Sequence, residues 1–285
     1  MANDAHNQKK FEFDAYQKLI SYSDWNDQSL SNISPGSPLT VIHLAGLAHQ
    51  MDGATEADMH AANTAFAIRV ARQALSAGAK TFVLVSTAKV MGDRTAKPVV
   101  ERNQPQPNDA YSRTKLAAEV ALQGLFRNSS CKLVIVRPPL VYGPQAKANF
   151  ESLMRWCATS VWLPFGAVIR PRSMVYIDNL CDALLWCSFN PAARPDIYFV
   201  KDAEDLSIRQ WITQTRQALG RPTRLLWVPI SLLKISAILL KKSVAIDKLV
   251  SSFQINDQQI RADGWAAPTT VREAISLTCA AWIHK

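Results

Sequence analysis

The chain has 285 residues, of which 48% are hydrophobic and 19% charged, and these proportions exclude a disordered or low-complexity protein. The formal net charge of +9 comes from scattered Lys and Arg without a run of five, so we predict no nucleic-acid partner. No apolar run reaches the roughly 18 residues of a membrane span, and the polar N-terminus has no signal-peptide pattern, so the expectation is a cytoplasmic protein without stable membrane insertion.

Cysteine spacing and charge limit the possible ligands further. The five cysteines form no C-x-x-C pair and no zinc spacing, which predicts buried reduced thiols and no metal site; they are Cys131, Cys157, Cys181, Cys187 and Cys279. The positive charge indicates either a basic surface without a special partner or attraction of an anionic ligand such as a diphosphate.

The segment Ser231–Lys242 is apolar with basic flanks, and we predict a core-facing helix there in preference to one that touches a membrane surface.

Strand-like and helical stretches alternate in the first two thirds of the chain. In chain order, the patterns predict a strand at 40–45, a helix at 54–77, a strand at 81–85, a helix at 109–126 capped by Asp109, and a strand at 132–136. Beyond residue 145 they predict a helix at 149–160, a strand at 174–177, a helix at 179–188 and mixed helix and loop from 200 to 285. This alternation predicts an α/β fold with a parallel sheet and helices on both faces.

The carboxyl ends of the predicted parallel strands carry the candidate functional residues. Tyr111 and Lys115 lie four apart on the predicted helix 109–126, so they share one face, where the ammonium can lower the pKa of the phenol. Such a pair alone also fits a surface helix without a function. Ser86 and Thr87 follow a buried strand, and Thr87 comes 24 residues before Tyr111. This combination indicates an acid/base site with an orienting hydroxyl.

These motifs, in this order, resemble the extended short-chain dehydrogenase/reductase (NAD-dependent epimerase/dehydratase) family over about residues 35–275. The resemblance rests on the segments 41–47, 82–92, 111–115 and 136–144, together with Asn63. The segments 163–166, 172–180 and 260–265 look most like bacterial UDP-N-acetylhexosamine 4-ketoreductases and UDP-glucose 4-epimerase-like proteins. The resemblance implies a Rossmann-like core at 1–145, with 172–200 crossing back into it, and a smaller substrate-binding domain formed by 146–171 and 201–285.

The resemblance also implies roles for individual residues. The implied catalytic residues are Thr87, Tyr111 and Lys115. The implied cofactor-binding residues, for NAD or NADP, are Ala45, Gly46, Leu47, Ser86, Tyr111, Lys115, Pro138 and Leu140. The implied substrate-binding residues are Lys89, Asn149, Phe165 and Arg172, of which Arg172 has the guanidinium suited to a diphosphate.

The implied activity is oxidoreduction at C4 of a UDP-sugar, by a 4-ketoreductase or a 4-epimerase of surface-polysaccharide or lipopolysaccharide sugar synthesis. Both reactions use the same side chains, so the motifs do not separate them. By analogy with the family, a homodimer is the expected assembly. A redox-sensing regulator of the same fold is less consistent with the Tyr/Lys pair.

One family feature is missing from the sequence. The first of the 10 glycines is Gly36, and no glycine-rich turn that could cradle a diphosphate occurs anywhere in the chain. The Rossmann-like sheet is therefore expected to be incomplete at its N-terminal side, with Phe11–Trp25 supplying at most one strand and a short helix. Three interpretations remain: a truncated or misassigned gene product, a degenerate non-catalytic homologue, or altered cofactor binding aided by another chain. Loss of the first strand would expose neighbouring strand edges, so we predict lowered stability and weak or absent cofactor affinity.

Overall fold

A parallel sheet forms the centre of one half of the molecule. The computed structural model describes residues 20–21, 23–26, 29–30, 38–47, 55–144, 146, 149–239, 246–247 and 250–283. Its four-stranded sheet has the order β1-β2-β3-β7, and all three pairings are parallel. The strands are β1 (Thr40–His43), β2 (Thr81–Val85), β3 (Lys132–Arg137) and β7 (Ile197–Phe199). The predicted α/β fold is confirmed; most of the segment Phe11–Trp25 lies outside the described residues.

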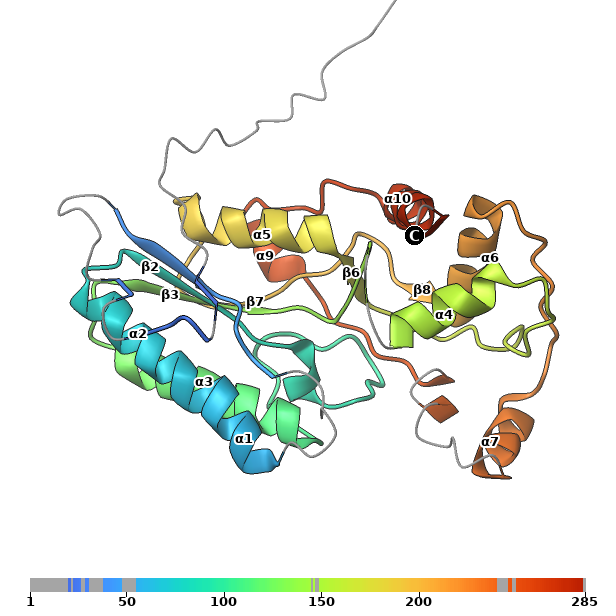
Figure 1. Ribbon diagram of the computed structural model, residues 1–285, viewed down its shortest axis with the longest axis horizontal. Coiled ribbons are helices and arrows are strands. Elements are labelled where there is room, and N and C mark those ends of the chain that lie inside the picture. The colour runs from blue at the N-terminus through green and yellow to red at the C-terminus, as the bar shows by residue number, and fades with distance from the viewer. Residues whose placement is uncertain are drawn as a thin grey trace, which may run out of the picture.

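Alternation of side chains along the central strands explains why helices cover both faces. In β2, Phe82 and Leu84 pack with α2 and α3 in one hydrophobic cluster, whereas Val83 packs with α5 in another. The covering helices are α2 (Phe66–Ser76), α3 (Ala110–Phe126), α5 (Ile177–Phe189) and α9 (Gln258–Ala262). Figure 1 shows α2 and α3 below the sheet and α5 and α9 above it.

The predicted helix at 54–77 is a single helical run with a local irregularity. It begins as α1 (Glu56–His60), continues as a π-helical turn η1 (Ala61–Ala65) and ends as α2. Thr55 caps its first turn, because its side chain accepts a hydrogen bond from the Asp58 amide. π-Helical turns of this kind are frequent at functional sites.

The second half of the molecule is built from helices and short strands. Its helices are α4 (Asn149–Ala158), α6 (Ile208–Ala218), α7 (Ile230–Leu239) and α10 (Val271–Ile283). Its strands form two small sheets, β4 (Leu140–Tyr142) with β6 (Met174–Tyr176) and β5 (Pro171–Arg172) with β8 (Leu206–Ser207). Between them, α5 and β7 return to the large sheet. The domain boundaries at 145, 171 and 200 stay predictions.

Two expectations about solvent exposure are corrected. The segment 231–242 was predicted to face the core, but among the α7 side chains that the structure describes only Leu233 is buried, while Leu232, Ile235 and Ile238 are exposed. Cys181 lies exposed on α5, whereas the other four cysteines are buried, and all five are free thiols. Among the residues that the structure describes, no helix is both long enough and apolar enough to cross a bilayer, and no His, Cys, Asp or Glu cluster could hold a metal ion.

Candidate active site at the carboxyl end of the sheet

The turn after β2 presents Thr87 at the carboxyl end of the sheet. The Ser86 amide donates to the Val136 carbonyl over 2.8 Å, and the Ala88 amide donates to the Pro138 carbonyl over 2.8 Å. Thr87 then caps the short 3₁₀ helix η2 (Ala88–Met91), since its hydroxyl accepts from the Lys89 amide over 3.2 Å. The turn is therefore fixed to the end of β3 on both sides of Thr87.

Asp109 sets where α3 begins and so fixes the position of Tyr111. Its carboxylate accepts from the Ser112 amide over 2.8 Å, which makes it the predicted N-cap. The same carboxylate pairs with the Lys89 ammonium. Burial alone raises the pKa of Asp109, but the hydrogen bonds from Lys89 and Ser112 outweigh it and lower the pKa to about 2. Asp109 therefore stays ionised and ties η2 to α3.

The structure brings Tyr111 and Thr87 together. The Thr87 hydroxyl lies near enough to the Tyr111 phenol to lower its pKa, and the Lys89 ammonium lies 5.8 Å from the centre of the Tyr111 ring. Burial nevertheless raises the pKa of Tyr111 to about 12, which the effect of Thr87 offsets only in part. The lowered phenol pKa expected from Lys115 is therefore not present in the protein alone.

Lys115 points from α3 to the edge of the sheet, where its ammonium donates to the Val85 carbonyl over 2.9 Å. Burial lowers the pKa of Lys115 to about 8, against the opposing effect of the Glu119 carboxylate. The loop after β1 approaches the same ammonium, because a Cβ placed on Gly46 would lie 3.0 Å from Lys115 Nζ. Val85, Gly46 and Lys115 thus meet at one point of the site.

Asn63 holds the loop after β1 in place, and it does so from the π-helical turn η1. Its Oδ1 accepts from the Leu47 amide over 2.7 Å, and its Nδ2 donates to the Leu47 carbonyl over 3.2 Å. Nδ2 also donates to Thr114 Oγ1 on α3 over 3.0 Å. The predicted cofactor-binding segment Ala45–Leu47 is therefore fixed relative to Lys115 through a single buried amide.

A buried ion pair lies one helical turn after Lys115 on α3. Arg137 donates to both Glu119 oxygens, over 3.1 Å and 2.5 Å, and neither side chain is more than 3% exposed. The Ser86 hydroxyl also donates to Glu119. Ser86 was predicted to bind cofactor, but its hydroxyl is committed to this buried pair. Sequence reasoning missed Glu119, although its position four residues after Lys115 and the charge of Arg137 at the end of β3 were available signals.

The remaining predicted residues lie on β4, α4 and β5 and in the loop before β5. Phe165 is buried in the core of the second half and stacks on Trp156 at 5.8 Å. The Arg172 guanidinium donates to the Ser251 carbonyl over 2.8 Å and to its hydroxyl over 3.1 Å. Leu140 is exposed on β4. Asn149 begins α4, and its side chain lies outside the described residues.

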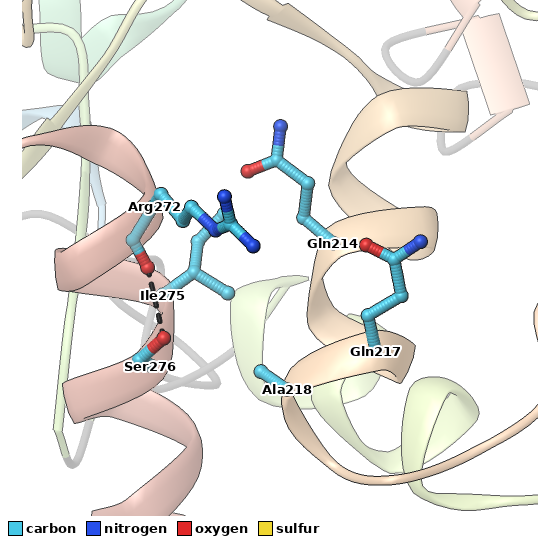
Figure 2. A pocket seen from close by; sticks show the side chains of 6 residues that line it. All are labelled: Gln214, Gln217, Ala218, Arg272, Ile275 and Ser276. Atoms are coloured by element: carbon cyan, nitrogen blue, oxygen red, sulfur yellow. Dashed lines mark hydrogen bonds between the residues drawn. The ribbon is translucent and has the colours of Figure 1, made fainter.

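A small cavity of about 170 Å³ lies elsewhere, between α6 and α10. Figure 2 shows it lined by Gln214, Gln217 and Ala218 on one helix and by Arg272, Ile275 and Ser276 on the other. The Ser276 hydroxyl donates to the Arg272 carbonyl over 3.0 Å, a contact within the helix. A volume of a few water molecules is too small for a nucleotide sugar, so this cavity is not the candidate active site.

The residues at the sheet edge fit one end of a nicotinamide dinucleotide. Lys115 offers a buried ammonium, and at Gly46 the absence of a side chain lets the backbone lie against it. For the diphosphate, by contrast, the part of the chain that the structure describes offers no glycine-rich turn at a helix N-terminus. The residues that the structure describes therefore fit the nicotinamide ribose end of the dinucleotide and not its diphosphate.

Fold and site together define a dehydrogenase-type α/β protein with a Thr, Tyr and Lys set at the carboxyl edge of a parallel sheet. The sequence profile of the "NAD dependent epimerase/dehydratase family" matches residues 3–200, and the chain belongs to this family. The match begins upstream of residue 35, where the sequence motifs placed the start of the resemblance.

Curated relatives support the same family. The chain is 35% identical over 273 residues to a UDP-glucose 4-epimerase of Vibrio cholerae, covering 93% of this chain and 83% of the relative. It is 26% identical over 216 residues to the N-acetyl-α-D-glucosaminyl-diphospho-ditrans,octacis-undecaprenol 4-epimerase of Escherichia coli O157:H7, covering 70% and 65%.

Solved structures share the fold. RMD from Pseudomonas aeruginosa complexed with NADPH superposes with a TM-score of 0.70 at 19% identity, covering 91% of this chain and 86% of that one. UDP-glucuronic acid 4-epimerase from Bacillus cereus in complex with NAD superposes with a TM-score of 0.70 at 16% identity, covering 93% and 80%.

Proposed function

We propose that the protein catalyses NAD(P)-dependent oxidoreduction at C4 of a UDP-sugar, as a 4-epimerase or a 4-ketoreductase. The observation that carries the proposal is that Thr87 lies beside Tyr111, with Lys115 one helical turn away, all at the carboxyl end of β2. Family membership and the 35% identity to a UDP-glucose 4-epimerase support the substrate class.

In this proposal the dinucleotide, when bound, supplies hydride exchange at C4 of the sugar. Tyr111 Oη transfers the proton to or from the C4 oxygen, and the Thr87 hydroxyl hydrogen-bonds the same oxygen and orients it. Lys115 would hold the nicotinamide ribose, and its ammonium would bring a positive charge toward the phenol. Such a charge is needed because the pKa of Tyr111, about 12 in the protein alone, lies far above neutral pH.

Lys89 and Arg172 are proposed to contact the substrate. Lys89 is held by Asp109 beside the Tyr111 ring, so a diphosphate that approached it would compete with that carboxylate. Arg172 would exchange the Ser251 carbonyl for a phosphate oxygen. The sugar diphosphate is common to UDP-sugars and to the lipid-linked sugar in the name of the E. coli relative, so both belong in the substrate panel.

A degenerate, non-catalytic homologue of the same fold is the second candidate, and it is favoured by the lack of a glycine-rich diphosphate turn in the sequence. Purified protein should be incubated with NAD⁺ and UDP-sugars, and separately with NAD(P)H and UDP-4-keto sugars, with products followed by NMR. A C4 epimer supports the epimerase, and a C4 alcohol with cofactor oxidation supports the reductase. No turnover in either reaction at saturating cofactor would reject catalysis and favour the second candidate.

A further inference from the structure

One end of the molecule carries a group of exposed apolar side chains that the catalytic proposal does not use. In Figure 1, α7 lies at the end of the molecule opposite the large sheet. The group, named here the α7 face, consists of Trp162, Leu226, Trp227, Leu232, Ile235 and Ile238. Trp227 is 72% exposed and Trp162 is 58% exposed. Two exposed tryptophans in one region are unusual for a surface that contacts only water.

Two of the segments that carry these side chains run side by side, and the second leads directly into α7. The Leu226 amide donates to the Leu163 carbonyl over 2.9 Å, so the segment that begins at Trp162 runs parallel to the segment that ends at Trp227. The buried Arg216 fixes both segments, because it donates to the Val161 carbonyl over 2.8 Å and the Arg224 carbonyl over 3.1 Å. The α7 face therefore rests on an ordered support.

Helix α7 itself is apolar on more than one side. Leu233 packs into the core of this half of the molecule, while Leu232, Ile235 and Ile238 follow one another at three-residue spacing on an exposed side. A helix that is apolar all round normally lies buried in a protein or in lipid. At ten residues, about 15 Å, α7 is too short to span a bilayer but long enough to lie in its interface.

The sequence segments that supply the α7 face carry basic residues but no acidic ones. The stretches 152–177 and 206–246, which supply all six residues of the face, contain no Asp or Glu. They contain ten basic residues, of which six are exposed in the structure: Arg155, Arg170, Arg209, Arg221, Arg224 and Lys234. Nearby carboxylates are already paired, Asp247 with Lys234 at 3.2 Å and Glu151 with Arg155 at 2.7 Å. Basic residues beside an apolar face attract anionic lipid headgroups.

We infer that the α7 face binds the surface of an anionic phospholipid bilayer. The tryptophans suit the headgroup level, the aliphatic side of α7 suits the acyl boundary, and the surrounding Arg and Lys suit the negative surface. A second copy of this chain is disfavoured as the occupant, because two such basic faces would repel each other. The inference does not depend on the proposed catalytic activity.

The test is flotation of the purified full chain with vesicles of phosphatidylcholine alone or of equal parts phosphatidylcholine and phosphatidylglycerol. Binding is expected only to the anionic vesicles and is expected to fall steeply at about 0.5 M salt, where charges are screened within a few ångströms. Ile235→Asp and Trp227→Ser should each weaken partitioning about tenfold, and Arg221→Glu about fivefold or more. Val120→Asp is the matched control, since Val120 is a 61% exposed aliphatic residue on α3, and it should bind as the wild type does.

Circular dichroism and thermal melting of each variant identify loss of folding separately from loss of binding. Absence of binding to the anionic vesicles would overturn the inference, and so would equal loss of binding in Ile235→Asp and Val120→Asp. A concentration-dependent dimer that Ile235→Asp dissociates, with vesicle binding unchanged, would assign the face to a second copy instead.

Discussion

Replacement of Glu119 by Gln tests whether the buried ion pair supports the site. The change leaves the Arg137 guanidinium buried, with side-chain exposure of only 3%, and without its bidentate carboxylate partner. Removing one partner of such a pair costs about 3–5 kcal/mol of unfolding free energy. For a chain of this size, that corresponds to a fall in Tm of roughly 6–20 °C.

Urea unfolding followed by circular dichroism and tryptophan fluorescence measures this cost. The control is Glu151→Gln, which breaks the Glu151–Arg155 pair on the surface of α4, where the arginine side chain is 67% exposed. That change should cost no more than about 0.5 kcal/mol. The double variant Glu119→Leu with Arg137→Met should regain most of the lost stability, because it removes both charges and keeps the volume. A Glu119→Gln variant within 1 kcal/mol of the wild type, or a double variant no more stable than the single one, would refute the reasoning.

Further predictions concern the cofactor, pH and the loop after β1. Fluorescence titration with NADH and NADPH should show weak or no binding, since the sequence lacks a glycine-rich diphosphate turn; micromolar affinity would contradict this. Burial, reinforced by the charge of Lys115, lowers the pKa of His43 to about 4 from 6.5, the value in the unfolded chain. The neutral His43 therefore contributes its full share of folding stability above pH 6.5, and that share is lost as the pH falls from 6.5 through 4. The loss is about 3 kcal/mol, and His43→Leu should abolish this part of the pH dependence measured by urea unfolding. Gly46→Ala places a Cβ 2.8 Å from Asn63 Oδ1 and should lower turnover about tenfold or more, whereas Gly124→Ala, with open space around it, should not.

The sheet was predictable because buried parallel strands have a simple pattern. The strand at 81–85 and the helix capped by Asp109 have the predicted bounds to within a residue, since a run of apolar residues and a capping carboxylate act locally. The meeting of Thr87 with Tyr111 was also predicted, because carboxyl ends of parallel strands share one edge.

Contacts between distant segments were not predictable in the same way. Ser86 ends a strand where the family resemblance implies a cofactor contact, yet its hydroxyl binds Glu119, 33 residues away. Arg172 has the charge for a phosphate, but in the structure it binds Ser251, 79 residues further on. The apolar pattern of 231–242 predicted a buried helix, but most of the described side chains of α7 are exposed. Composition alone does not reveal whether other elements are available to cover an apolar helix.

Tyr111 is proposed to be the proton-transferring group of a C4 catalyst. The most direct measurement compares turnover of a UDP-sugar by Tyr111→Phe and by Tyr198→Phe, each with saturating cofactor. Tyr198 is the matched control, because its hydroxyl binds Asp263 on the far side of the sheet from α3. Tyr111→Phe should lose about 10²–10⁴-fold in turnover rate, whereas Tyr198→Phe should keep nearly full activity. Equal activity in the two variants would contradict this role of Tyr111.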